Sequence, residues 1–233
     1  HFKRKWSFFL THDLMTKLQR GQRQDGDVTR SRILEVAGTL FAKTGFAETP
    51  SKTIAAQAEV DLASINYHFG SRNGLYQAVL VAAHRRLVYL SALQKLAESP
   101  LSAEEKLSAV IAYLVPELKA GQDDWHLKVL AREILSPSSH ITVLFQTELM
   151  PKLAFVRAIL SEVTGIPVEN PALSRCLVCF AAPCMMLLIG PRSVPGPLHE
   201  VTRMPRQELI NHLRTYALAG LAAIGAEFKS SVT

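Results

Sequence analysis

Apolar residues recur at helical spacing along most of the chain. Ile33, Ala37 and Phe41 lie four positions apart, and Gly45 follows them where a residue with positive φ commonly ends a helix. A longer apolar stripe runs without interruption through residues 72–98. No segment shows the strict alternation of apolar and polar residues, flanked by turn residues, that predicts a β-hairpin. No sequence repeat of fixed length is evident. The pattern therefore predicts an all-α fold.

Three short helices are predicted within residues 29–70. The first carries the stripe just described, and the second begins at Thr49-Pro50, which has the form of an N-cap followed by proline at the first helical position. Asp61 can cap the third helix by accepting a hydrogen bond from the backbone amide of Ser64. Gly70 then breaks the helical pattern.

The remainder of the chain is predicted to be a set of longer helices. Ser71 caps a fourth helix that runs from Arg72 to near Glu98 and is long enough to join two domains. Further helices are predicted at residues 103–119, 124–135, 140–163, 170–189 and 206–228. The breaks between them fall at Gly121, Pro137, Gly165-Ile166-Pro167 and a loop rich in proline and glycine at 190–205.

Residues 51–70 have the composition of a helix-turn-helix. Two helices that cross steeply need a small residue where they meet, and Ala55 occupies that position. Their facing sides need apolar groups, which are Ile54, Ala58, Val60 and Ile65. Glu59 departs from the pattern, because glycine is expected at a turn residue with positive φ and a Cβ there costs on the order of 1 kcal/mol. A pair of ordinary core helices would share much of this pattern.

The residues that follow distinguish these alternatives. The stretch Ile65-Asn66-Tyr67-His68-Phe69-Gly70-Ser71-Arg72 resembles the end of the recognition helix and the start of helix four in TetR-family regulators. The segments Phe41-Ala42-Lys43-Thr44-Gly45-Phe46 and Ile54-Ala55-Ala56-Gln57-Ala58 are similar to that family's helix-one end and helix two. The resemblance covers about residues 29–80. Glu59, and Gly74 where the family often has Glu, depart from the commonest pattern.

The resemblance implies a DNA-binding surface. It places Ala63, Ser64 and Asn66 toward base edges in the major groove. Asn can bond adenine through two atoms, Ser can bond several bases, and Ala can pack on the methyl group of thymine. The residues expected to meet the phosphate backbone are Tyr67, His68, Arg72, Arg30, Arg32, Ser51, Lys52 and Thr53. His68 is equally suited to packing, and Phe69 is better suited to the core.

The charge distribution favours a polyanionic partner. The net charge is +6, and residues 1–32 hold most of the excess, with eight basic residues against Asp13, Asp25 and Asp27. A basic arm suits nucleic acid or an anionic membrane surface, and it also suits a merely solubilising tail. Residues 1–28 are therefore expected to be a basic, flexible segment ahead of a DNA-binding domain at 29–75. Because the chain begins at His1 and Met15 precedes the first helix, we assign no function to residues 1–14.

Residues 76–233 are expected to form a helical domain for effector binding and dimerisation. A protein that reads one half-site needs a two-fold partner to read a palindromic operator. The nearly all-apolar stretch Cys176–Ile189 and the helix at 206–228 can form a four-helix interface from two subunits. The resemblance places an effector pocket between helix four and these helices. The candidates there are Trp125, His126, Arg132, Phe145, Glu148 and Met150, although such residues are more often plain core. Arg132 and Glu133 are as well suited to a structural ion pair.

Other classes of function find less support. A helical enzyme or small-molecule-binding protein without specific DNA binding would use His84, His126 or His140 as a base, but no phosphate-binding loop, nucleophile elbow or paired-carboxylate signature is present. Three cysteines on an apolar helix, with no convincing fourth ligand nearby, indicate buried thiols in a reducing cytoplasm and no metal site. No cofactor and no catalytic residue are predicted. The longest uncharged stretch, Cys176–Gly190, is shorter than the ~20 residues of a membrane span.

The sequence therefore predicts a cytoplasmic DNA-binding transcription regulator. We expect a homodimer that represses by binding a palindromic operator in double-stranded DNA and is released by a small-molecule effector. The sign of regulation is supplied by the family resemblance, and activation stays open at this point. A basic arm that anchors an interaction protein to a membrane surface is the third alternative.

Overall fold

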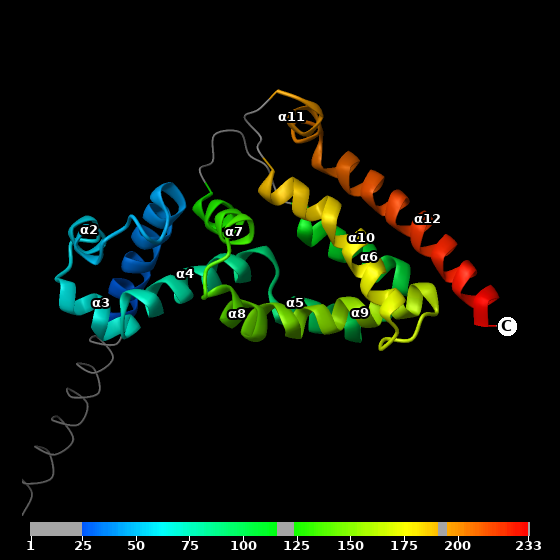
Figure 1. Cartoon of the computed structure of the whole chain (residues 1–233), viewed down its shortest axis with the longest axis horizontal. Helices are drawn as coiled ribbons and strands as arrows, with labels where there is room; N and C mark the ends of the chain where they lie inside the picture. Colours follow the sequence, from blue (N-terminus) through cyan, green and yellow to red (C-terminus); the bar gives the residue numbers. More distant parts are fainter. Residues whose placement is uncertain (1–24, 116–123, 191–194, 233) are drawn as a thin grey trace, which may run out of the picture. The chain divides into compact units, whose positions relative to one another are not determined.

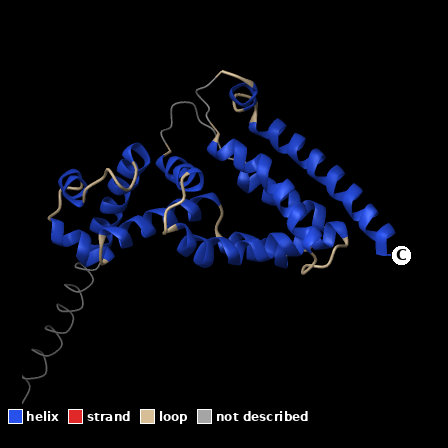
Figure 2. Cartoon of the chain, in the orientation of Figure 1, coloured by secondary structure: helices blue, strands red, loops and turns tan. Residues whose placement is uncertain are grey.

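A computed structural model of the chain describes residues 25–115, 124–190 and 195–232, and every regular element in these ranges is a helix (Figures 1 and 2). The all-α prediction is confirmed. The described residues divide into two compact units, of which the first ends at Val79 and the second begins at Leu80. Each unit has its own buried apolar core.

The first unit is a three-helix domain followed by the start of a fourth helix. Its first helix is described over residues 25–44, and α2 (Ser51–Gln57), α3 (Leu62–Phe69) and the beginning of α4 (Arg72–Leu87) follow. Phe41 is fully buried and meets Tyr76 edge-on, with 5.0 Å between the ring centroids. The other fully buried large side chains of this unit are Ile33, Ile54, Ile65 and Leu75. These apolar positions are the ones that the helical periodicity selects.

The predicted N-cap of the second helix is wrong by one residue. Pro50 occupies the N-cap position with extended backbone, and the helix begins at Ser51. Thr49 is buried instead, and its hydroxyl donates to the carbonyl oxygen of Gly45 at 2.6 Å and lies 2.8 Å from the hydroxyl of Thr44. A threonine hydroxyl can donate to a nearby backbone carbonyl, or it can accept from a backbone N–H at the start of a helix. Local spacing alone therefore does not decide between these partners.

The single helix predicted over residues 72–98 is also wrong, because the chain breaks after Leu87. Tyr89 has extended backbone, with φ −78° and ψ 135°, and α5 (Leu90–Glu98) begins after it. Val88 and Tyr89 belong to the β-branched and aromatic classes, which lose side-chain freedom in a helix. The break lets α5 present Leu93 and Leu96 to the buried core of the second unit. Tertiary packing thus overrides a helical pattern that is continuous in the sequence.

The second unit is a bundle of helices of unequal length. After α5 come α6 (Ala103–Leu114), α7 (Trp125–Leu135), α8 (Ile141–Leu144), a π-helical turn η1 (Phe145–Leu149), α9 (Met150–Thr164), α10 (Pro171–Ile189), α11 (Pro197–Val201) and α12 (Arg206–Val232). The predicted helices at 124–135 and 170–189 are found within one residue. The helix predicted at 103–119 ends at Leu114, and its last residues lie outside the described ranges. The described part of the predicted 190–205 loop contains α11.

Helix α9 lies at the centre of this bundle. It packs against α5, α6, α10 and α12, and its side chains Ile159 and Leu160 are buried there. The contact with α12 is close, because a Cβ added at Gly225 would lie 2.5 Å from the carbonyl oxygen of Thr164. Only glycine allows the two backbones this approach.

Helix α10 is unusually apolar. By length and composition alone, Pro171–Leu188 is the one stretch of the described residues that could cross a membrane, and 39% of it is buried inside the protein. A core helix meets the same criterion, and α10 packs against α6, α7, α9 and α12. These contacts account for the buried part of its apolar surface, and the rest is left exposed.

Candidate nucleic-acid interface and effector region

The first unit contains the predicted helix-turn-helix. Ile54, Ala55 and Ala58 of the α2 region and Ile65 of α3 are buried where the two helices meet. The turn between them has Glu59 at φ 52°, the sole positive φ of a non-glycine residue among the described residues. Asp61 accepts a hydrogen bond from the Ser64 amide at 2.8 Å, as predicted, and another from the Ser64 hydroxyl at 2.7 Å. The hydroxyl, and then the amide, lower the pKa of Asp61.

The outward face of α3 is polar and exposed. Ala63, Asn66 and Tyr67 are exposed, and Tyr67 leaves 84% of its surface accessible, whereas Ile65 between them is buried. Ser64 is half-buried and its hydroxyl donates to Asp61 at 2.7 Å, so that hydroxyl also supports the cap. An aromatic ring that is mostly in solvent on a short helix gains little packing energy inside the protomer. Its position is consistent with contact to an external partner.

The basic residues around α3 fall into two groups. Arg32 and Lys52 are exposed, Thr53 beside Lys52 is exposed as well, and Ser51 is half-buried. Arg30 is exposed and also lies over the ring of Phe69, 4.9 Å from its centroid.

Arg72 has a role in the fold that the sequence does not indicate. Its guanidinium lies over the ring of Phe46, 4.2 Å from the centroid, and donates to the backbone carbonyls of Phe46 and Ala47, the latter at 3.2 Å. These contacts tie the start of α4 to the loop after the first helix. His68 is half-buried and meets Tyr67 edge-on at 4.9 Å. The proposed phosphate contacts of both residues stay predictions.

Gly74 is explained by packing. A Cβ at this position would overlap the carbonyl oxygen of Phe69. Gly74, one of the two residues that depart from the commonest family pattern, is therefore required by the local backbone.

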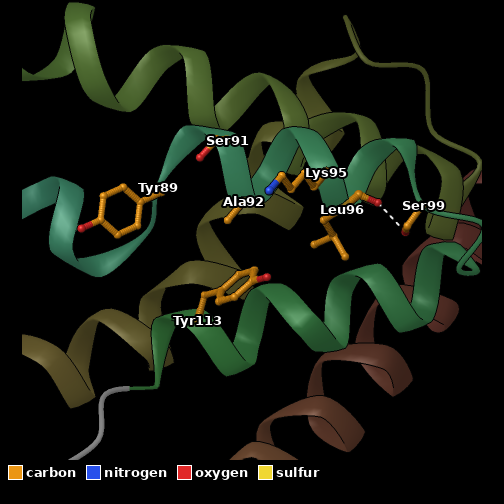
Figure 3. Close-up of a pocket in the computed structure, with 7 residues that line it drawn as sticks. All are labelled: Tyr89, Ser91, Ala92, Lys95, Leu96, Ser99 and Tyr113. Carbon is orange, nitrogen blue, oxygen red and sulfur yellow. Dashed lines mark hydrogen bonds between the residues drawn. The ribbon is translucent and has the colours of Figure 1, made fainter.

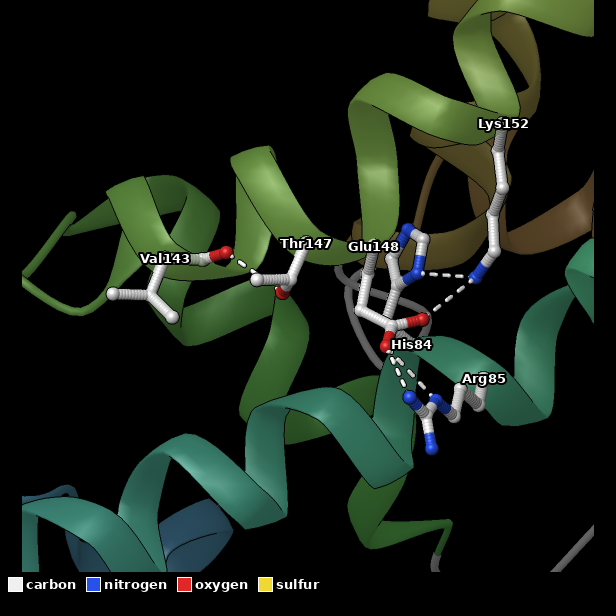
Figure 4. A network of polar contacts seen from close by, with 6 residues as sticks. All are labelled: His84, Arg85, Val143, Thr147, Glu148 and Lys152. Atoms are coloured by element: carbon white, nitrogen blue, oxygen red, sulfur yellow. Dashed lines mark hydrogen bonds and ion pairs between the residues drawn. The ribbon is translucent and has the colours of Figure 1, made fainter.

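A partly buried polar cluster lies in the second unit, between α4, η1 and α9 (Figure 4). Glu148 is paired with Arg85, with 2.6 Å between the nearest atoms, and with Lys152 at 3.4 Å. Lys152 also lies 2.9 Å from Nδ1 of His84. We call His84, Arg85, Glu148 and Lys152 the polar cluster.

Burial and the charges within the polar cluster lower the pKa of three of its members. Burial, and then the charge of Lys152, lower the pKa of His84 to about 4. Burial also lowers the pKa of Lys152, in spite of Glu148. Burial alone would raise the pKa of Glu148, but Arg85 and Lys152 together hold it below its usual value. The cluster therefore favours neutral His84 and ionised Glu148.

The six predicted effector residues differ in burial and in their contacts. Glu148 belongs to the polar cluster, whereas Trp125 and His126 are buried and stacked on each other, with 3.7 Å between their ring centroids. His126 also lies 2.8 Å from the Asp124 carboxylate. The other three candidates, Arg132, Phe145 and Met150, are exposed.

Two grooves in the second unit are lined by other residues. One, of about 380 Å³, lies between α5 and α6 and is lined by Tyr89, Ser91, Ala92, Lys95, Leu96, Ser99 and Tyr113 (Figure 3). The other, of about 520 Å³, lies along α10 and α12 and includes Cys179, Phe180, Tyr216 and Gly220. We call them the tyrosine groove and the α10–α12 groove. No sequence signal joins Tyr89 to Tyr113, but the i, i+4 spacing of Glu148 and Lys152 could have indicated part of the polar cluster.

The cysteines were expected to be buried, and this is wrong for one of them. Cys176 and Cys184 are buried, and burial raises the pKa of both, to about 11 for Cys184. Cys179 is exposed on the same helix because it lies on the uncovered face of α10. Within the described residues, no three His, Cys, Asp or Glu side chains are arranged to hold a metal ion.

Comparison with known proteins agrees with both halves of this description. A family model described as bacterial regulatory proteins of the tetR family matches residues 33–79. A second, described as the C-terminal domain of the HTH-type transcriptional dual regulator CecR, matches residues 103–224, which is more than half of the chain. No curated protein matches the chain.

Solved structures share the fold at low sequence identity. The fatty acid degradation regulator FadR from Bacillus halodurans is 15% identical, with a TM-score of 0.63 over 83% of this chain and 96% of that one. FadR from Bacillus subtilis, solved in complex with stearoyl-CoA, is 17% identical, with a TM-score of 0.63 over 82% and 98%. A transcriptional regulator from Pseudomonas aeruginosa PAO1 is 15% identical, with a TM-score of 0.66 over 85% and 93%. The chain therefore belongs to the TetR family of DNA-binding transcriptional regulators, with a C-terminal domain of the CecR type.

Proposed function

We propose that the protein is a dimeric repressor that binds a palindromic operator through α3 and is released by a small molecule bound in the second unit. The observation that carries the DNA-binding part is the exposed face of α3, with Tyr67 84% accessible beside exposed Asn66 and Ala63. Asn66 can hydrogen-bond a base and Ala63 can pack on a thymine methyl group. Arg30, Arg32 and Lys52 supply the charge that meets phosphates.

A second copy of the chain is the proposed partner at α10 and α12. Tyr216 on α12 is 68% exposed and lines the largely apolar α10–α12 groove, and Val178, which precedes the lining residue Cys179 on α10, is 65% exposed. Exposed apolar surface of this kind is costly in a monomer and is typical of subunit interfaces. A two-fold dimer would present two copies of α3 to the two halves of a palindrome.

The direction of regulation is part of the proposal. The matched C-terminal domain is named for a dual regulator, so the same chain could activate at some sites. The structure of Bacillus subtilis FadR with stearoyl-CoA supports a small-molecule response in a protein of this fold. A ligand releases the operator only in proportion to its differential affinity for the DNA-bound and free conformers. Since such a protein acts on the chromosome, we propose a cytoplasmic location and no catalytic activity.

Selection of bound duplexes from a random DNA pool tests the DNA-binding part. We expect the wild type to enrich a palindrome and the Asn66→Ala, Tyr67→Ala double variant to enrich none at physiological salt. Val143→Ala is the control, since it removes an exposed apolar side chain of the second unit that lines neither groove. Enrichment of the same palindrome by all three proteins would mean that α3 does not read the sequence, and enrichment by none would contradict the proposal.

Sedimentation equilibrium tests the dimer. Gly220 lies in the α10–α12 groove and has open space around it in the protomer. Gly220→Arg should therefore convert the dimer to a folded monomer, because a buried unpaired charge opposes association. Tyr113→Arg, on α6, should leave the dimer intact. A Gly220→Arg variant that stays dimeric would place the interface elsewhere.

A further inference from the structure

The tyrosine groove lies apart from the residues proposed for DNA binding and for dimerisation. Its lining comes from the N-cap of α5 and one face of that helix, with Tyr113 contributed by α6 (Figure 3). Its volume of about 380 Å³ falls within the range of small-molecule sites. The whole lining belongs to the second unit.

The walls of the tyrosine groove suit a flat aromatic molecule. Tyr89 is 61% exposed and Tyr113 is also exposed, so both rings have uncovered faces. Leu96, which is buried, and Ala92 supply an apolar surface between the two tyrosines. Aromatic rings prefer to stack in an offset or edge-on manner, and a pair of such contacts adds to the energy of burial.

The polar groups of the groove suit an anion. Lys95 is the one charged side chain among the seven lining residues, and no carboxylate is among them. Lys95 is exposed, and Ser91 lies one turn before it on the same helix face. A ligand carboxylate or sulfonate beside Lys95 would form a charge-assisted hydrogen bond without having to displace an acidic group.

We propose that the tyrosine groove binds a flat aromatic anion, a carboxylate or sulfonate on a fused-ring system, and that this binding is the effector event of the regulation proposed above. The second half of this inference rests on that proposed function. The first half, the binding of the anion, does not.

The position of Tyr89 connects binding to conformation. Tyr89 is both a wall of the groove and the residue whose extended backbone separates α4 from α5. The sequence of residues 72–98 is compatible with an uninterrupted helix, in which Tyr89 would have helical ψ and its ring would leave its present position. A ligand that contacts Tyr89 therefore binds the broken form better than the continuous form. The break at Tyr89 lies just beyond the end of α4, and α4 begins just after the C-cap of α3. A change at the break therefore acts on the helix that directly follows the recognition helix.

Fluorine NMR of the protein labelled with 3-fluorotyrosine tests the binding. The chain has five tyrosines, so each can be assigned by its own Tyr→Phe variant. The probe is 2-naphthoate, a fused-ring carboxylate. We expect saturable shifts at Tyr89 and Tyr113 and none at exposed Tyr67 and Tyr216. Lys95→Met should weaken binding about tenfold, whereas Lys43→Met, at an exposed site of the first unit, should not.

Two results would overturn the binding half of the inference. One is a naphthoate response centred on Tyr216, which would assign the probe to the α10–α12 groove. The other is the absence of any shift at millimolar probe. Equal affinity of wild type and Lys95→Met for naphthoate would refute the claim that the groove recognises the negative charge of its ligand.

The operator recovered by duplex selection tests the regulatory half. Loss of operator affinity in naphthoate, abolished by Lys95→Met, would support it. An unchanged operator affinity at saturating naphthoate would refute the effector role while the proposed DNA binding still stands. If duplex selection fails, that result counts against the proposed function. The fluorine shifts at Tyr89 and Tyr113 would still test whether the tyrosine groove binds the anion.

Discussion

The ammonium of Lys152 lies 2.9 Å from Nδ1 of His84, which joins α9 to α4 between residues 68 positions apart. Lys152 is only 4% exposed, and its other partner is Glu148 at 3.4 Å. A neutral imidazole can accept a hydrogen bond at Nδ1, whereas a protonated one would face the ammonium with a proton of its own. The contact therefore depends on a neutral His84.

The stability of the protein should consequently depend on His84 below neutral pH. Its pKa is lowered from 6.5 to about 4 by burial and then by Lys152. As the pH falls below 6.5 the unfolded chain gains a proton at this site and the folded chain does not, so stability is lost. From about pH 7 to about pH 5 we expect a loss of about 2 kcal/mol from this residue. Urea unfolding of wild type and His84→Gln measures it, and equal pH slopes would contradict the prediction.

Glu148 should matter to stability mainly through the charges it neutralises. Glu148→Gln leaves Lys152 buried without its carboxylate and should cost about 2–4 kcal/mol in the free energy of unfolding. Removing the second charge as well, in Glu148→Gln with Lys152→Met, should recover part of that loss. Chemical denaturation of the single and double variants measures the coupling. Strictly additive losses would mean that the two groups do not interact.

Glu59 offers a way to stabilise the first unit. Its φ of 52° is in the left-handed region, where a Cβ is unfavourable. Glu59→Gly should raise the free energy of unfolding by about 0.5–1 kcal/mol after the extra freedom of glycine in the unfolded chain is taken into account. Glu59→Ala keeps the Cβ and should show no such gain. A gain of equal size in both variants would assign the effect to the lost charge.

Arg72 should be sensitive to a change that keeps its charge. Lysine cannot reproduce the planar contact with Phe46 together with the hydrogen bonds to two carbonyls. We expect Arg72→Lys to lower the stability of the first unit by about 1 kcal/mol. If a cation at this site also meets a phosphate, operator affinity measured well below the melting temperature should fall much less than in Arg72→Ala. Equal losses of affinity would mean that Arg72 acts through the fold.

The two glycines of α12 should respond oppositely to alanine. Gly225→Ala forces the Cβ toward the Thr164 carbonyl and should destabilise the protein by about 1–3 kcal/mol. Gly220→Ala meets no atom in the protomer and should not destabilise its fold, because alanine is the better helix former. Thermal unfolding of the two variants under identical conditions makes the comparison. Similar melting temperatures would contradict the close approach of α9 and α12.

The features that the sequence predicts well are local ones. The Asp61 cap on Ser64, the positive φ at Glu59 and the left-handed Gly45 each depend on a few neighbouring residues. The buried face of the helix-turn-helix follows from the spacing of Ile54, Ala58 and Ile65. Local backbone chemistry and helical periodicity carry this information directly.

The features that escape prediction depend on residues far apart in the chain. The break at Tyr89 follows from burial of Leu93 and Leu96 in a core built mostly from later helices. The polar cluster needs α4 beside η1 and α9, and the tyrosine groove needs α5 beside α6. The six predicted effector residues were chosen by residue type within the region where the family resemblance places a pocket. Type alone did not show that only Glu148 among them joins a charged cluster.

The unequal cysteines of α10 have a practical consequence. The thiolate is the reactive form, and burial disfavours it at Cys176 and Cys184, so Cys179 should be the thiol that a maleimide reaches first. Cys179 also lines the α10–α12 groove. The rate at which Cys179 is alkylated therefore reports whether the α10–α12 groove is covered. Dilution that separates two chains should raise this rate, and association of two chains should lower it.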